Sequence, residues 1–206
     1  MKGHGFQMTI FKRSLIALLL LLSTCAELQA QRGALVAPRN LGQLVEQSAV
    51  VVRGRVASAR VEAHPQFANI HTVLITLAVD KTFKGVAPSI MTVRQFIWDA
   101  RDVRDGAGYM KGQTVMLLLN APTKLGMQST AGLDQGRFRV LKDSSGVEIV
   151  ANGNANQFLF RGLDAYAAAK GVTLSAKVRQ TIAAPPEKLT LSQLEEMITM
   201  LAGVHK

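Results

Sequence analysis

Histidine and aspartate are the residue types in this chain whose spacing first raises the question of metal chemistry. His64 and His71 stand seven residues apart on either side of Pro65. A zinc-binding helix instead places two histidines four residues apart, so that both rings share one face. The histidine spacing therefore favours an exposed loop and the start of a strand over a metal site.

Three aspartates form the densest acidic cluster, and calcium is the ion that they would suit. Asp99, Asp102 and Asp105 recur every third residue, with Arg101 and Arg104 between them. Calcium loops of the EF-hand type use alternate positions instead. The interleaved arginines favour a solvated loop that neutralises its own charge.

Phosphate-binding and nucleophile motifs are the remaining catalytic patterns to consider. Gly106-Ala107-Gly108 is not followed by the Gly-Lys-Ser/Thr of a phosphate loop, and Ser144-Ser145-Gly146 fits a turn better than a nucleophile elbow. No acid and base can be paired. We therefore expect a protein that is not an enzyme and that uses no cofactor or metal.

Arginines on predicted strands give the best candidate for a binding site. If these strands are neighbours, their side chains can form one basic face for an extended anionic or sugar-like ligand, with Phe96, Trp98 and Tyr109 nearby in the sequence. The alternative is that the arginines are scattered and individually solvated, which leaves the loops around Trp98 and Gly126 as the candidate contact surface. The candidate binding residues are Arg53, Arg55, Arg94, Trp98, Tyr109, Arg137 and Arg139.

Composition limits the class of protein. The chain has 206 residues, 48% of them hydrophobic, with 24 basic against 14 acidic residues and a single cysteine. This is too apolar for a disordered chain, and one cysteine makes neither an intrachain disulfide nor a cysteine-built zinc site. The net charge of +10 suggests either an anionic partner or simple solubility.

The N-terminus has the three parts of a signal peptide. Lys12-Arg13 precedes eight apolar residues, Leu15 to Leu22, and Ala30 offers a small residue for cleavage. We expect residues 1–30 to direct export to the periplasm or the medium. A lipoprotein attached at Cys25 is the alternative. The apolar run is shorter than the roughly 20 residues of a membrane-spanning helix, so no transmembrane span is predicted.

Apolar alternation then predicts a sheet. Asn40 can cap a short helix over residues 41–47, and Gly54 marks a bulge or a close backbone approach. The run Thr114 to Leu119 is almost entirely apolar and predicts a central strand. Strands are predicted over residues 49–60, 71–82, 90–96, 114–119, 137–141 and 146–150.

The last quarter of the chain changes to a helical pattern. Residues 163–170 are rich in alanine, and residues 175–183 are weakly helical. Thr190 and Gln193 form a capping-box pattern before an apolar stripe that reaches Leu201. Helices are therefore predicted to follow the sheet.

Five segments carry a family resemblance: Ser48–Val56, Asp80–Gly85, Met91–Gln95, Tyr109–Leu119 and Gly132–Val140. They resemble the netrin-like or TIMP-like module with an OB fold, and more closely a group of uncharacterised exported bacterial proteins that contain it. The resemblance implies a five-stranded, OB-like Greek-key barrel over residues 40–150. With the helical pattern that follows, we expect an all-β core with helical appendages, in which a helical extension over residues 151–206 packs on the barrel. The resemblance says little about chemistry.

Two functions agree with these observations. The first is an exported, non-enzymatic binding module for a protein or an anionic envelope polymer, with nucleic acid an unexpected partner outside the cytoplasm. The alternative is a TIMP-like inhibitor of an exported metalloprotease. Inhibitors of that family use an N-terminal cysteine, whereas cleavage after Ala30 would leave Gln31 first. Inhibition would therefore have to act through the loops of the barrel.

Overall fold

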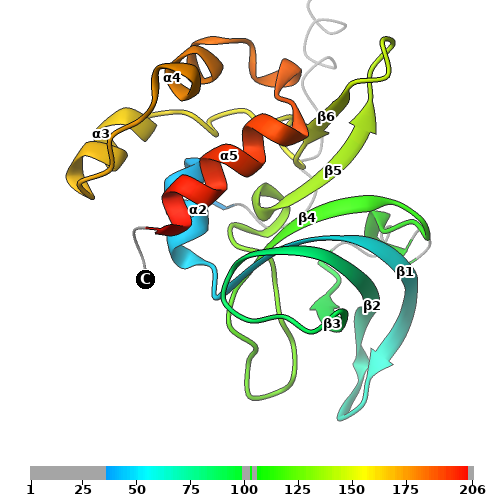
Figure 1. Cartoon of the computed structure of the whole chain (residues 1–206). Helices are drawn as coiled ribbons and strands as arrows, with labels where there is room; N and C mark the ends of the chain where they lie inside the picture. The colour runs from blue at the N-terminus through cyan, green and yellow to red at the C-terminus, as the bar shows by residue number, and fades with distance from the viewer. Residues whose placement is uncertain (1–35, 99–102, 104–105, 204–206) are drawn as a thin grey trace, which may run out of the picture. The chain divides into compact units, whose positions relative to one another are not determined.

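Strands dominate the chain between residues 50 and 151 in the computed structural model, which describes residues 36–98, 103 and 106–203 (Figure 1). They form one antiparallel six-stranded sheet in the order β3-β2-β1-β4-β5-β6. The strands are β1 (Val50–His64), β2 (Phe67–Lys84), β3 (Ile90–Phe96), β4 (Thr114–Leu119), β5 (Arg137–Lys142) and β6 (Glu148–Ala151). The predicted combination of a sheet with appended helices is confirmed.

Four α-helices accompany the sheet in the described part of the chain: α2 (Leu41–Gln47), α3 (Leu163–Ala169), α4 (Ala176–Ala183) and α5 (Leu191–Ala202). Asn40 and Thr190 form the capping boxes of α2 and α5, with Gln43 and Gln193 as their partners. Both predicted caps are confirmed, because a capping box depends only on residues that are neighbours in the sequence. No helix among the described residues is long and apolar enough to cross a membrane.

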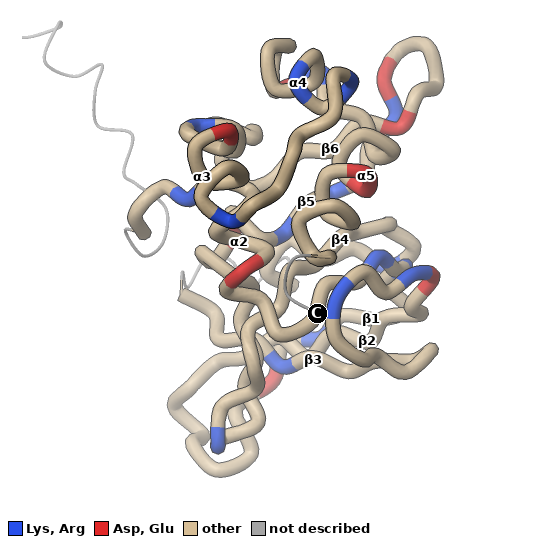
Figure 2. Tube along the Cα trace, turned by 60° about the vertical axis from the view of Figure 1, so that its left-hand side comes forward, with Lys and Arg blue, Asp and Glu red and all other residues tan. Residues whose placement is uncertain are grey.

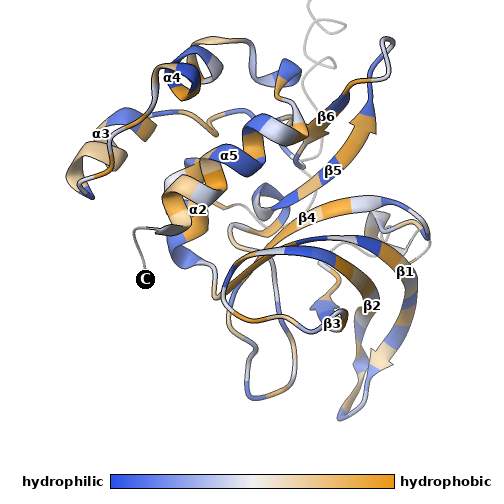
Figure 3. Cartoon of the chain, in the orientation of Figure 1, coloured by the Kyte–Doolittle hydropathy of each residue, from blue (hydrophilic) through white to orange (hydrophobic). Residues whose placement is uncertain are grey.

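Strand β4 lies in the middle of the sheet and is apolar along almost its whole length (Figure 3). Its residues alternate between two hydrophobic cores, one on each face of the sheet. Met116 and Leu118 join a core shared with α2, α3, α4 and α5, whereas Val115, Leu117 and Leu119 join a core formed mainly by β1, β2 and β3. We call these the helix-side core and the sheet core.

The apolar alternation of the predicted strands places nine residues in the barrel interior: Val50, Val52, Val56, Val73, Ile75, Leu77, Val115, Leu117 and Phe138. Most of them lie in the sheet core, including Ile75 and Leu117. Phe138 is different, because the alternation of β5 points it to the opposite face, where it is fully buried in the helix-side core. Val51, expected on the outer side of its strand, is also buried there. Val50, expected inside, is only partly buried.

The hairpin of β1 and β2 is longer than its sequence pattern predicted. Both strands continue to a tight turn at Pro65-Gln66, and His64 pairs with Phe67 where a loop was expected. Gly54 is the predicted close approach, since a Cβ there would lie 2.5 Å from the carbonyl oxygen of Ala78. The register of β1 and β2 also shifts at this glycine, as in a bulge.

Some predictions fall on residues outside the described ranges. These are the signal peptide of residues 1–30 with Cys25, and the aspartate loop of Asp99, Asp102 and Asp105.

Candidate functional site

The predicted basic face is divided between the two sides of the sheet. Residues directly opposite each other in antiparallel strands share a face. Arg53 lies opposite Met116 of the helix-side core, whereas Arg137 lies opposite Leu117 of the sheet core. Arg55 lies two residues after Arg53, and Arg139 lies two residues after Arg137, so each shares the face of the earlier arginine. The four arginines therefore do not form one face, and basic residues are spread along the chain (Figure 2).

Arg53 is occupied by contacts within the chain. Its guanidinium donates a hydrogen bond to Glu195 of α5 and lies 3.8 Å from a carboxylate oxygen of Asp80. Lys81 donates to the second oxygen of Glu195 at 2.8 Å. These contacts hold α5 against the sheet, so Arg53 is a structural residue in this arrangement.

Tyr109 and Arg137 are brought together, but largely inside the protein. Arg137 lies 4.7 Å from the centre of the Tyr109 ring and forms a 3.0 Å ion pair with Asp134. It also donates a hydrogen bond to the carbonyl oxygen of Ala107. The hydroxyl of Tyr109 donates to Oε1 of Gln95 at 2.9 Å, and only 4% of the tyrosine is exposed. This cluster closes the sheet core and offers little surface to a ligand.

Burial raises the pKa of Tyr109 to about 12 from its usual 10. Because the unfolded tyrosine ionises first, the free energy of unfolding is expected to fall by about 2 kcal/mol as the pH rises from 10 to 12. Denaturant titrations across this range should show a smaller fall for Tyr109→Phe, because that variant cannot ionise there. The protein with Tyr109 and the Tyr109→Phe variant should both also carry Tyr166→Phe, because burial raises the pKa of Tyr166 as well. Equal falls would contradict this assignment.

Arg94, Phe96 and Trp98 come together on the outer face of β2 and β3. Arg94 lies opposite Leu74 and Phe96 lies opposite Thr72, whereas the alternate residues Val73 and Val93 point into the sheet core. We call this region, defined by Glu62, Thr72, Arg94, Phe96 and Trp98, the β2–β3 surface.

A polar network fixes the centre of the β2–β3 surface. Arg94 donates to Oγ1 of Thr72 at 2.9 Å and to Oε1 of Glu62 at 2.6 Å. Arg60 donates to the other oxygen of Glu62 at 2.7 Å. These two arginines, Arg94 foremost, lower the pKa of Glu62. The guanidinium of Arg94 is therefore held in place beside the aromatic residues.

The aromatic residues of this surface are exposed. Phe96 and Trp98 meet edge to face, with ring centres 4.7 Å apart and an interplanar angle of 71°. The exposed fractions are 36% for Phe96 and 58% for Trp98. Large aromatic side chains with an open face are typical of binding surfaces, where they contribute apolar area at a low cost in conformational entropy.

Two loops adjoin the β2–β3 surface: the turn between β1 and β2, and the connection between β4 and β5. In the second of these, the backbone N–H of Gln128 donates to the carbonyl oxygen of Arg94 at 2.8 Å. Nε2 of His64 lies 3.0 Å from the carbonyl oxygen of Leu125, and the His64 ring stacks on Phe67 at 5.3 Å. Phe67 and Leu125 are both exposed.

Neither Phe67 nor Leu125 was predicted to be a site residue, although Leu125 lies in the loop around Gly126 that was the alternative contact surface. The signal for each was a large apolar residue within a segment predicted to be a loop. His64, expected to be exposed, is buried under the same loop.

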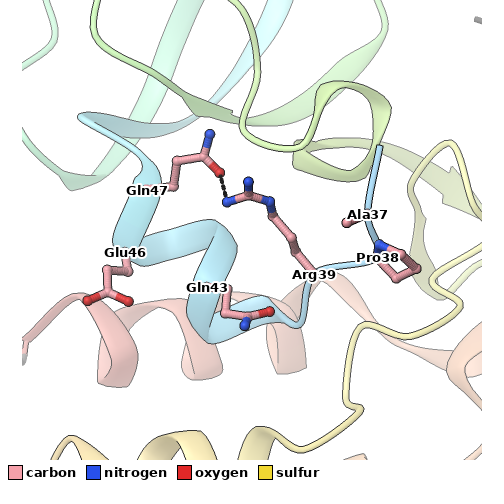
Figure 4. A pocket seen from close by; sticks show the side chains of 6 residues that line it. All are labelled: Ala37, Pro38, Arg39, Gln43, Glu46 and Gln47. Atoms are coloured by element: carbon pink, nitrogen blue, oxygen red, sulfur yellow. Dashed lines mark hydrogen bonds between the residues drawn. The ribbon is translucent and has the colours of Figure 1, made fainter. Parts of the chain in front are cut away.

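A depression of about 480 Å³ lies elsewhere, beside α2 (Figure 4). Its one guanidinium, that of Arg39, donates a hydrogen bond to the side-chain oxygen of Gln47. No group of three or more metal-binding side chains occurs among the described residues. No protein-family model matches the chain, and no curated protein matches it.

Proposed function

We propose that this protein is an exported, non-enzymatic binding module that holds an extended segment of a partner protein on its β2–β3 surface. The observation that carries the proposal is the exposed pair of Phe96 and Trp98 beside the fixed guanidinium of Arg94. A rigid aromatic pair next to an ordered polar network suits recognition without chemistry.

The order of the strands supports an OB-type module. Strand β1 pairs with both β2 and β4, β2 also pairs with β3, and β4 also pairs with β5, which are four of the strand pairs that an OB barrel requires. Gln128 bonds to β3 on the side where such a barrel would close. OB modules bind ligands on the face of strands 2 and 3 and on the two loops that adjoin it. These elements carry Phe96, Trp98, Phe67 and Leu125 here, which fits the resemblance to netrin-like modules.

The pairing of the arginines favours a protein over an anionic polymer. Arg53, Arg94 and Arg137 each contact a carboxylate of this chain. Arg55 and Arg139 are exposed, but the strand register places them on opposite faces of the sheet. A polyanion that lay along one face would therefore meet few of these positive charges together.

Trp98→Ala is expected to weaken the capture of the partner at least tenfold, as loss of a central aromatic contact does. The immobilised protein would be incubated with exported proteins of its host, and each retained protein quantified by mass spectrometry. Val147→Ala, which truncates an exposed apolar residue beyond the β5–β6 turn, is the matched control and should retain wild-type capture.

Three results would count against this proposal. One is equal capture by wild type and Trp98→Ala. Another is heparin binding that needs Arg55 or Arg139 but not Trp98, because it would indicate an anionic polymer as the ligand. The third is a retained metalloprotease whose activity falls on binding, which would favour the inhibitor hypothesis instead.

A further inference from the structure

We propose that the outer edge of β3 pairs with an extended peptide of the partner, which thereby adds a strand to the sheet. This inference rests on the proposed function, since it assumes a protein ligand at the β2–β3 surface. It specifies how that ligand is held, namely by backbone hydrogen bonds.

The hydrogen bonds at the two ends of β3 show which backbone groups point outward. The N–H of Val79 donates to the backbone carbonyl oxygen of Ser89 at 2.8 Å, and the N–H of Ile97 donates to that of His71 at 3.2 Å. In an antiparallel pair, the residues between these positions alternate between facing the partner strand and facing away from it. The N–H and C=O groups of the residues at positions 90, 92, 94 and 96 therefore point away from β2.

One of these outward groups already has a strand-like partner. The carbonyl oxygen of Arg94 accepts from Gln128, as it would from a neighbouring strand. Within the described part of the chain, the backbone groups of Ile90 and Thr92 have no hydrogen-bond partner. The edge is therefore covered at Arg94 and open over the first half of β3. An exposed edge strand of this kind is a template for another extended chain.

The side chains along the open half suit such a ligand. Ile90 is 60% exposed, and Thr92 beside it is exposed as well. Both lie on the outer face, where residues directly opposite on an added strand would meet them. A peptide with β-branched or apolar residues at alternate positions would cover Ile90 and Thr92. Its remaining side chains would point to the other face.

A second copy of this chain fits the edge less well than a free peptide. Antiparallel pairing of two β3 strands centred on Thr92 would place Arg94 opposite Ile90 of the other copy. Gln128 already occupies the outward carbonyl of Arg94 in each copy. A peptide whose backbone pairing with β3 ends before Arg94 has no such conflict.

Hydrogen exchange measured by NMR tests the edge before any ligand is known. In the free protein, the amides of Ile90 and Thr92 should exchange at least tenfold faster than those of Met91 and Val93, which face β2. Addition of a peptide selected from a phage-displayed random heptapeptide library should slow the exchange of Ile90 and Thr92. Methylation of alternate backbone nitrogens of the peptide should abolish this slowing of exchange for only one of the two alternating sets, the set whose N–H groups point toward β3.

Thr92→Pro removes the outward N–H while leaving the ladder with β2 intact, so the protein should still fold. We expect it to weaken binding of the selected peptide at least tenfold. Thr92→Val keeps the N–H and should bind like wild type. Circular dichroism and thermal melting would show that both variants are folded.

Slow exchange of Thr92 in the free protein would overturn the inference, because the edge would already be occupied. Protection that rises with protein concentration would overturn it in favour of self-association. Peptide binding that needs Trp98 but is unchanged in Thr92→Pro would also overturn it, while leaving the proposed function intact. A library that yields no binding peptide would overturn the edge-pairing inference as well. The proposed function would then be tested separately, by whether Trp98→Ala loses capture of the partner.

Discussion

Leu117→Ala is expected to lower the free energy of unfolding by about 2–5 kcal/mol. Leu117 is fully buried in the sheet core on the central strand β4, between Val52 of β1 and Arg137 of β5. Truncation would leave a cavity that strands on both sides restrain from collapsing. A loss of this size is a large part of the roughly 5–15 kcal/mol that stabilises an ordinary domain.

Urea denaturation followed by circular dichroism would measure the effect as a lower midpoint. Leu141→Ala is the matched control, because the same side chain is removed from an exposed position on β5 and should change the stability by less than about 0.5 kcal/mol. If Leu117→Ala had the wild-type urea midpoint, the assignment of Leu117 to the core would be wrong.

Asn156→Ala is expected to cost about 3 kcal/mol or more, because one side chain serves several buried backbone groups. Its amide nitrogen donates to the carbonyl oxygens of Val150 at 2.7 Å and Pro186 at 2.9 Å, and its oxygen accepts from the N–H of Asn152 at 3.0 Å. Asn156 is almost completely buried, so water cannot replace these bonds. Its side chain thus ties the end of β6 to the segment before α5.

Backbone strain and lost hydrogen bonds can be separated at this position. Asn156 has a φ of 61°, which asparagine and glycine tolerate better than alanine. Asn156→Gly should therefore be less damaging than Asn156→Ala by up to about 1 kcal/mol, yet still clearly destabilised. The exposed Asn154→Ala provides a neutral control. Wild-type stability of Asn156→Gly in a urea titration would mean that the hydrogen bonds contribute little.

Local patterns predicted the elements of this fold well. A period of two in β1 and β2 identifies strands with one buried face, a continuous apolar run identifies β4 as a strand buried on both faces, and capping residues fix the starts of α2 and α5. The extension of the hairpin to His64 and Phe67 was not predicted, because prediction from alternation fails where the alternation is weak. Pro65 and the polar residues around it weaken the alternation, and the pairing of two long strands across a tight turn outweighs that local signal.

The candidate site was harder to predict, because it depends on register between strands. A shift of one residue moves a side chain to the other face, so the relation of Arg53 to Arg137 is not contained in either strand alone. The partner of Arg53 is Glu195, 142 residues away in the sequence. Arg94 and Trp98 are close in the sequence, on one strand and directly after it. The alternation of residues 90–96 left the buried face of that strand ambiguous, and its pairing with β2 decides which face Arg94 occupies.

The long sequence separation between α5 and the strands that it covers has a consequence for the order of folding. The buried residues of α5, including Leu194 and Ile198, complete the helix-side core, so one face of the central strands lacks its cover until α5 has been made. A nascent chain on the ribosome can form the β1–β2 hairpin early, but its native topology must await the emergence of α5. Contacts over such long sequence separations slow folding and prolong the exposure of apolar surface, which favours chaperone binding.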